Sequence, residues 1–167
     1  SDDPSISADG RYVAFTSYAT NLVPSDTNTY PDIFVHDRQT GQTTIASLDS
    51  AGIQGNYYSY LPSISIDGRC VAFTSEASNL VPEDTNGWAD VFVHNRQSGQ
   101  TTRVSVDSTG NQGNNQGGYP SISADGRYVA FMSPASNLVP GDPNGRADVF
   151  AHDRRGCFPT VARYCPA

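Results

Sequence analysis

The chain of 167 residues is a 58-residue unit written three times, and this internal repeat limits the possible folds more than any other feature. The tetrapeptide Pro-Ser-Ile-Ser begins at Pro4, Pro62 and Pro120, with no insertion between the copies. A fixed period of this size is typical of architectures in which one structural unit recurs along the chain. The expected units are residues 1–61, 62–119 and 120–167.

Each repeat contains four strand-like runs. In the first repeat these runs are residues 4–7, 12–17, 32–37 and 43–48. Asp9-Gly10 separates the first two runs, and Asp-Gly is the strongest short signal for a β-hairpin. Every basic residue is an arginine and Glu is rare, so the chain has few of the residues that usually cover exposed helix faces. Four antiparallel strands without a helix are typical of one blade of a β-propeller.

The repeat also resembles a known family. Residues 4–15 read Pro-Ser-Ile-Ser-Ala-Asp-Gly-Arg-Tyr-Val-Ala-Phe, and residues 32–38 read Asp-Ile-Phe-Val-His-Asp-Arg. This pattern resembles the TolB-type β-propeller repeat, which is related to the Trp-Asp repeat, and the resemblance covers nearly the whole chain. It implies four-stranded blades around a central axis, usually six or seven to a ring. Members are binding platforms, parts of periplasmic machines or domains attached to peptidases, so the resemblance implies no single activity.

Three blades are too few for a closed ring, because propellers typically have about 4–8 blades. The end blades would expose apolar residues such as Val13, Phe15 and Phe34 to water, which is unfavourable. Either a second copy completes a six-bladed ring with two-fold symmetry, or the chain is part of a longer polypeptide. The chain begins at a first strand and stops after a fourth, which favours a joint between copies. We therefore expect an all-β propeller with three four-stranded antiparallel blades per chain, completed to six blades by a second copy.

The end of the third repeat departs from the pattern. Without gaps, residues 160–164 align with residues 44–48, which predicts a fourth strand there. Cys157 and Cys165 could instead form a disulfide, but a strand would separate them by roughly 26 Å, and a disulfide needs Cα atoms within about 7 Å. The strand and the disulfide therefore exclude each other. Cys70 stands where the other repeats have tyrosine, and we interpret it as a packed thiol.

The loop between the second and third runs has the pattern Asp-x-Asn-x-x-x-Asp in every repeat. Calcium takes oxygen ligands from carboxylates, amides and backbone carbonyls in flexible loops, so the pattern suggests a Ca²⁺ site in each blade. The alternative is that Asp and Asn only cap tight turns through nearby backbone amides. The candidate ligands are Asp26, Asn28, Asp32, Asp84, Asn86, Asp90, Asp142, Asn144 and Asp148.

Three histidines, His36, His94 and His152, recur at one position of the third run. Zinc is often bound by three histidines, but this run lies away from the axis of a propeller and the three cannot meet. We expect each histidine to form a structural hydrogen bond within its own blade.

Aromatic and amide residues gather in the same loops and in the linkers between repeats. Tyr30, Tyr57, Tyr58 and Trp88 are the candidate ligand-binding residues, because rings stack on sugars or peptides while amides give directional hydrogen bonds. Tyr60 and Tyr119 directly precede a repeat's Leu-Pro or Pro, and we interpret them as anchors of the next blade.

Charge and motifs restrict the function. A net charge of −7 without a basic run argues against nucleic acid as a partner. No apolar stretch approaches the ~20 residues of a membrane span, and no Gly-x-Ser-x-Gly elbow is present. We expect a secreted or periplasmic, non-catalytic binding module for a glycan or a peptide or protein ligand, stabilised by Ca²⁺. The alternatives are a domain of a sugar- or peptide-active enzyme outside the cytoplasm, and a structural repeat of a surface protein.

Overall fold

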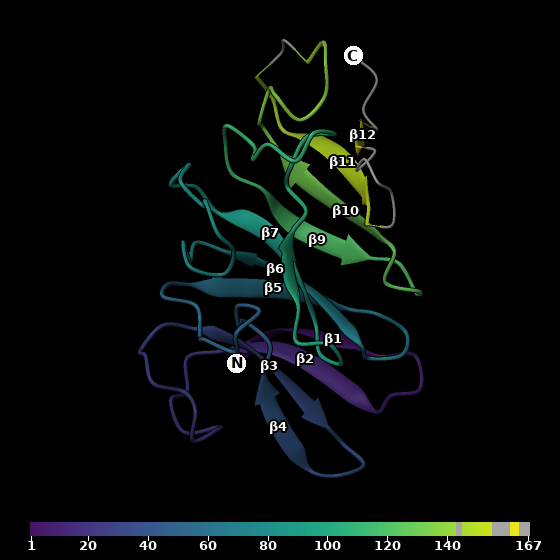
Figure 1. Ribbon diagram of the computed structural model, residues 1–167. Coiled ribbons are helices and arrows are strands. Elements are labelled where there is room, and N and C mark those ends of the chain that lie inside the picture. Colours follow the sequence, from purple (N-terminus) through teal and green to yellow (C-terminus); the bar gives the residue numbers. More distant parts are fainter. Residues whose placement is uncertain (143–144, 155–160, 164–167) are drawn as a thin grey trace.

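The computed structural model describes residues 1–142 and 145–154, and it also describes the backbone of residues 161–163. The described residues form three four-stranded antiparallel sheets and no helix. Figure 1 shows the sheets fanned one above another, with the first repeat at the bottom and the third at the top. The predicted all-β architecture of three blades is confirmed.

Each blade consists of four strands that pair in sequence order. The strands of blade 1 are β1 (Asp2–Ile6), β2 (Tyr12–Ser17), β3 (Asp32–Asp37) and β4 (Gln42–Ile45). The strands of blade 2 are β5 (Ser59–Ile64), β6 (Cys70–Ser75), β7 (Asp90–Asn95) and β8 (Thr101–Arg103). The strands of blade 3 are β9 (Gly118–Ile122), β10 (Tyr128–Ser133), β11 (Asp148–Asp153) and β12 (Val161–Arg163).

The first strand of each blade contains a β-bulge. In blade 2 the pairing register shifts between Tyr60 and Ser63, and β5 begins at Ser59, before the predicted unit boundary at residue 62. The bulge explains this difference, because it lets the strand pair with β6 on both sides of the proline. At the bulge Asp3, Leu61 and Tyr119 have φ values of 52°, 55° and 54°. Such left-handed conformations cost about 1–3 kcal/mol for residues other than glycine.

The predicted strand in the tail of blade 3 exists, but its gapless alignment with blade 1 is wrong by two residues. Arg163 lies opposite Phe150, as Ile45 lies opposite Phe34 in blade 1. The gapless alignment would place Val161 there. The connection between β11 and β12 therefore has two more residues than its counterpart in blade 1. Cys157 and Cys165, and with them the predicted alternative of a disulfide, lie outside the described residues.

The core lies between the blades. Blade 1 packs Ala14, Ile33 and Val35 against one face of blade 2, where Val71 and Phe73 receive them. The other face of blade 2 packs against blade 3 in the same way. Every residue of β6 is buried, because blade 2 is covered on both faces.

The hydrogen bonds between neighbouring blades repeat as well. The Ala8 N–H donates to the Ile66 carbonyl (3.2 Å), and the Ile66 N–H donates to the Ala124 carbonyl (3.0 Å). The Ile64 N–H donates to Ser5 Oγ, and one joint further the Ile122 N–H donates to Ser63 Oγ, both at 3.1 Å. The two joints are therefore copies of one head-to-tail interface.

The outer faces of the two end blades are partly open. On blade 1, Ile6 is exposed and Phe15 is half-buried, although the matching residues of blade 2, Ile64 and Phe73, are buried. On blade 3, Tyr128 and Met132 are exposed, whereas the matching strand of blade 2 is covered. The open face of blade 3 corresponds to the face by which blade 1 contacts blade 2.

The described residues include no helix of the length and apolar character that a membrane span requires.

Candidate binding face

The loops between the second and third strands and the linkers between blades lie at the same end of the blades. The Ser59 N–H at the end of one linker donates to the Pro31 carbonyl at the end of a loop (2.9 Å), and the Gly117 N–H donates to the Ala89 carbonyl (2.7 Å). We call this end the loop face. It contains the predicted metal ligands and the predicted aromatic residues.

In blade 1 the Asp-Asn loop holds the linker that leads to blade 2. Gln54 Nε2 donates to Asp26 Oδ1 (2.9 Å) and to Asp32 Oδ2 (2.6 Å). Asn28 Nδ2 donates to the Gly55 carbonyl at 2.9 Å. One glutamine amide thus bridges the two carboxylates that the sequence suggested for Ca²⁺.

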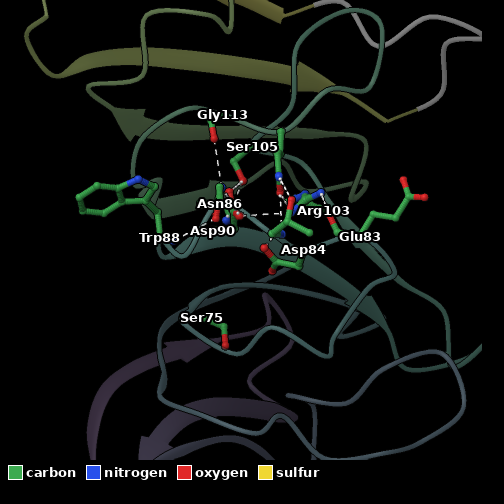
Figure 2. Close-up of polar contacts among 12 residues, drawn as sticks. Ser75, Glu83, Asp84, Asn86, Trp88, Asp90, Arg103, Ser105 and Gly113 are labelled. Carbon is green, nitrogen blue, oxygen red and sulfur yellow. Dashed lines mark hydrogen bonds and ion pairs between the residues drawn. The ribbon is translucent and has the colours of Figure 1, made fainter.

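In blade 2 an arginine lies between the equivalent carboxylates, as Figure 2 shows. Arg103 Nη1 is 3.1 Å from Asp84 Oδ1 and 3.3 Å from Asp90 Oδ2. Asn86 Nδ2 donates to the Gly113 carbonyl at 3.0 Å, as Asn28 does to its own linker. The guanidinium supplies the positive charge that the two carboxylates need, and blade 1 has the uncharged Ile45 at this position.

The last aspartate of each loop is a buried structural group. Ser47 Oγ donates to Asp32 Oδ1 at 2.6 Å, and Ser105 Oγ donates to Asp90 Oδ1 at 2.5 Å. Burial raises the pKa of Asp32 and that of Asp90 above the ordinary value, although these hydroxyls act in the opposite direction. The pKa of Asp84 is raised by burial and by the charge of Asp90.

In blade 3, Asp142 and Asp148 are buried, and Asn144 lies outside the described residues. Within the described part of the chain, no three His, Cys, Asp or Glu side chains are grouped so that they could hold a metal ion. A site that also used amide and carbonyl oxygens is not tested by this observation. Ca²⁺ binding by the Asp-Asn loops therefore stays a prediction.

Two of the histidines form the predicted bond within their blade. His36 Nδ1 lies 3.0 Å from Thr43 Oγ1, and His94 Nδ1 lies 2.8 Å from Thr101 Oγ1. His152 is buried, and its Nδ1 has no hydrogen-bond partner among the described residues. Burial lowers the pKa of His94 and of His152 to about 4, so both rings are neutral at neutral pH.

Three of the four predicted aromatic residues meet in one cluster on the loop face. The ring centroids of Tyr30 and Tyr57 are 4.7 Å apart, those of Tyr57 and Tyr58 are 4.7 Å apart, and those of Tyr30 and Tyr58 are 5.3 Å apart. Trp88, which occupies the position of Tyr30 in blade 2, is about half exposed. Figure 2 shows its ring turned away from Asp84 and Arg103.

Cys70 is buried between blades 2 and 3, as expected for a packed thiol. A Cβ atom built on Gly126 would lie 3.0 Å from the Cys70 sulfur, and Arg154 Nη1 is 3.6 Å from it. In blade 1 the larger Tyr12 fills the equivalent place.

A hollow of about 210 Å³ lies between blades 2 and 3 on the loop face, and it does not appear among the residues singled out from the sequence. Its wall includes Tyr60 and Tyr119, which the sequence suggested only as anchors of the next blade. Leu61 and Tyr119, the bulge residues with positive φ, both line this wall. The other lining residues include Thr74, Gln116, Gly118, Ser133 and Pro134.

The hollow exists because blade 3 has Gly118 where blade 2 has Tyr60. Tyr60 is partly buried, and its hydroxyl donates to Glu76 Oε1 at 3.4 Å. Burial and the charge of Glu76 raise the pKa of Tyr60 to about 12. Blade 3 has Pro134 in place of Glu76 and no side chain at Gly118, so the space is not filled from within.

One buried polar group lines the hollow without a partner. Thr74 is 1% exposed, and its Oγ1 has no hydrogen-bond partner among the described residues. In blade 1 the equivalent Thr16 Oγ1 donates to Asp3 Oδ2 at 3.3 Å, but Leu61 replaces this aspartate in blade 2. An unsatisfied buried hydroxyl costs about 1–3 kcal/mol, and a ligand that bonded it would recover this cost.

The departure from the repeat at residues 116–118, Gln-Gly-Gly in place of Tyr-Ser-Tyr, is visible in the sequence. This change of sequence produces a hollow only because residues of blade 2 form the opposite wall. That blades 2 and 3 lie against each other follows from the fold and not from the repeat. The sequence predicts no set of acid, base and nucleophile.

No family model matches the chain, and no curated protein matches it either. Solved structures do match. TolB from Acinetobacter baumannii is 20% identical with a TM-score of 0.59, over 99% of this chain and 32% of that one. Putative TolB from Agrobacterium tumefaciens is 18% identical with a TM-score of 0.57, over 95% of this chain and 47% of that one. The β-propeller domain of the Trilobed protease from Pyrococcus furiosus is 15% identical with a TM-score of 0.62, over 98% of this chain and 42% of that one.

The chain therefore consists of β-propeller blades. Its three blades are of the TolB-like kind, as the repeat suggests. It spans less than half the length of the propeller proteins that it matches, so it forms a partial propeller.

Proposed function

We propose that the chain is a non-catalytic binding module whose loop face holds a peptide segment of a protein partner in the hollow between blades 2 and 3. The observation that carries the proposal is the buried Thr74 hydroxyl, which has no hydrogen-bond partner among the described residues and lies in the wall of a hollow that a glycine leaves open.

The lining favours a peptide over a glycan. Leu61 and Pro134 are apolar, and Tyr60 and Tyr119 add aromatic groups. A sugar ring has hydroxyls on every edge, and burying them needs many polar partners. The described wall combines these apolar groups with the polar residues Thr74, Gln116 and Ser133. A side chain with an apolar body and one polar group suits it better.

The size of the hollow points to one aromatic side chain. A volume of about 210 Å³ is below the usual range of about 300–1,000 Å³ for pockets that hold drug-sized ligands. The neighbouring joint has a tyrosine of the chain itself, Tyr60, where this joint has Gly118. A tyrosine or similar residue of the partner would take the equivalent place and bring a hydroxyl within reach of polar groups.

N-acetyl-tyrosinamide is a suitable probe, with amide shifts in NMR spectra as the readout and N-acetyl-alaninamide as the control compound. We expect saturable shifts at Thr74 and Gly118 with the tyrosine compound only. Gly118→Tyr should abolish them without unfolding the chain, since Gly118 does not have a positive φ and blade 2 has a tyrosine at this position. Shifts that persist in this variant, or a hollow that responds to neither compound, would contradict the proposal.

A second copy of the chain is part of the same proposal. The open face of blade 3 is equivalent to the face that blade 1 presents to blade 2, and the open face of blade 1 is equivalent to the receiving face of blade 2. Blade 3 of one copy can therefore dock on blade 1 of another through the interface that already occurs twice within the chain. Two such joints would close a six-bladed ring.

The contacts of that joint follow from the joint between blades 1 and 2. There the Tyr12 ring lies against Gly68, and the Arg96 guanidinium carbon is 4.7 Å from the ring centroid. At the joint between copies, Tyr128 takes the role of Tyr12, while Gly10 and Arg38 take the roles of Gly68 and Arg96. Tyr128 is 43% exposed in the single chain, which leaves it accessible for this contact.

Ca²⁺ in the Asp-Asn loops and a secreted or periplasmic location complete the proposal. Blade 1 is the best candidate for the metal, because no described guanidinium lies between Asp26 and Asp32 as Arg103 does in blade 2. Thermal unfolding with Ca²⁺ and with EDTA tests the metal: an unchanged midpoint removes it from the proposal. The location is supported by the TolB-like fold alone, and cell fractionation tests it.

A further inference from the structure

The two linkers of the chain are held on the following blade by one set of contacts. The linker to blade 2 contains Gln54-Gly55-Asn56, and the linker to blade 3 contains Gln112-Gly113-Asn114. Each segment lies on a short stretch after the second strand of the blade it enters. We call this stretch the shelf, which is residues 77–80 in blade 2 and residues 135–138 in blade 3.

On the shelf of blade 2 the asparagine forms a reciprocal pair. Asn56 Nδ2 donates to Ser78 Oγ (3.1 Å), and the Ser78 N–H donates back to Asn56 Oδ1 (2.9 Å). The Asn56 N–H donates to Asn79 Oδ1, and Asn79 Nδ2 donates to the Gln54 carbonyl, both at 2.9 Å. These four hydrogen bonds involve both the backbone and the asparagine side chain of the segment.

The shelf of blade 3 repeats all four bonds. Asn114 exchanges two bonds of 3.0 Å with Ser136. Its N–H donates to Asn137 Oδ1 at 2.9 Å, and Asn137 Nδ2 donates to the Gln112 carbonyl at 3.0 Å. The segment and the shelf therefore form the same contacts at both joints.

The glycine in the middle of the segment lies close against the shelf. A Cβ atom on Gly55 would lie 3.3 Å from the Ala77 Cβ and 3.5 Å from Leu80 Cδ2. A Cβ atom on Gly113 would meet the equivalent Ala135 and Leu138 at 3.4 and 3.5 Å. A larger residue would lift the backbone from the shelf and lengthen the hydrogen bonds beside it.

Blade 1 has the same shelf, residues 19–22, but no described residue occupies it. The sequence there is Ala-Thr-Asn-Leu, against Ala-Ser-Asn-Leu in the other blades. Thr20 and Asn21 are exposed, and neither side chain forms a hydrogen bond with a described residue. Leu22 is 38% exposed, whereas Leu80 and Leu138 are each 1% exposed.

The free shelf has the same capped turn as the shelf of blade 2. The Ala19 N–H forms the same cap as its counterparts, since it donates to Ser17 Oγ at 3.2 Å, as Ala77 donates to Ser75 Oγ at 3.1 Å. A segment that docks on it would not have to reorganise this turn, which lowers the cost of binding.

We propose that the shelf of blade 1 is a binding site for an extended Gln-Gly-Asn segment, and that its occupant is the linker that follows the preceding blade of the ring. The asparagine of the segment pairs with Thr20, and Asn21 bonds the backbone on either side of the glycine. The site is independent of the hollow between blades 2 and 3 and of the peptide proposed to bind there.

A ten-residue peptide with the sequence of residues 49–58 is the probe, titrated against the full chain with amide shifts in NMR spectra as the readout. We expect saturable shifts at Thr20, Asn21 and Leu22. Asn21→Ala should weaken binding about thirtyfold, as expected for the loss of two hydrogen bonds worth about 1 kcal/mol each. A peptide with valine in place of the glycine is the matched control and should bind more weakly.

The same ten residues joined covalently before Ser1 give a second measurement, because residue 58 directly precedes Ser59, the counterpart of Ser1. This extension should raise the midpoint of thermal unfolding, and Asn21→Ala should cancel the rise. Asn21 is exposed, so the substitution should leave the unextended chain unchanged. A rise that survives Asn21→Ala would overturn the proposal. An absence of shelf shifts together with an unchanged midpoint would overturn it as well.

Discussion

The ring of Tyr12 in blade 1 lies directly on the backbone of Gly68 in blade 2. A Cβ atom built on Gly68 would lie 2.6 Å from the Cγ atom of Tyr12 and closer still to Cδ2. Gly68 also has a φ of +69°. One position of the Asp-Gly turn thus serves the hairpin of its own blade and the contact with the blade before it.

Gly68→Ala should therefore cost more than the backbone strain alone. Gly99→Ala is the matched control, because Gly99 has a φ of +74° and nothing within 4 Å of its added Cβ. We expect about 1 kcal/mol of lost stability for Gly99→Ala and about 1–3 kcal/mol more for Gly68→Ala, from overpacking against Tyr12. Urea unfolding of both variants measures the difference. Equal losses would show that Tyr12 moves aside freely.

Gly10→Ala tests the joint between copies. Gly10 has the same φ of +69°, but in the single chain its added Cβ meets only Arg38 Nη1 at 3.5 Å. If Tyr128 of a second copy covers Gly10, the wild-type chain should have twice the mass of one 17.9 kDa chain in light scattering, and Gly10→Ala should be a monomer. Gly41→Ala, which has open space around it, should stay a dimer. A wild-type monomer at high concentration would contradict the six-bladed ring.

Arg103→Ile gives blade 2 the residue that blade 1 has at Ile45. The change leaves Asp84 and Asp90 without their described cation, and removing one partner of a buried pair costs about 3–5 kcal/mol. We expect a large loss of stability at neutral pH, and a smaller loss in acid, where the carboxylates protonate. Denaturant unfolding at several pH values measures this. A loss that is the same at every pH would show that the guanidinium acts by packing rather than by charge.

His94 makes the chain less stable in weak acid. Its pKa is about 4 in the folded protein, against 6.5 for an ordinary histidine. The unfolded chain binds more protons between these values, so stability falls as the pH drops from 6.5 towards 4, by up to roughly 3 kcal/mol for this group. The raised pKa values of Asp32 and Asp90 act in the opposite direction.

His94→Asn isolates the contribution of the histidine, because the amide can still reach Thr101 and does not titrate. The stability difference between wild type and variant should shrink as the pH falls through this window. A constant difference would mean that the pKa of His94 is the same in the folded and the unfolded chain.

The blades could be predicted because their signals are local. Alternating apolar residues and an Asp-Gly turn predict the first hairpin of each blade. The same signals recur in every 58-residue repeat. The last strand could not be placed correctly, because the gapless alignment assumed that the connection before Val161 has its usual length. Arg163 opposite Phe150 shows that it does not.

The sites depend on contacts between units, which no single repeat contains. The sequence shows Gly118 in place of a tyrosine, but an absent side chain becomes a hollow only when Tyr60 and Thr74 of another blade enclose it. Similarly, Arg103 is a visible change from Ile45, yet its position between two carboxylates of a distant loop follows from the fold. The aromatic cluster could be predicted because its members lie on the loop face of adjacent blades.

The identical joints between blades have a consequence at high protein concentration. The open face of blade 3 can bind the open face of blade 1 in another copy, so chains can be added at both ends. Only closure of a ring stops this growth. The angle between successive blades therefore decides between a small closed particle and an open filament. A substitution that changes this angle without weakening the interface would turn a discrete assembly into a polymer.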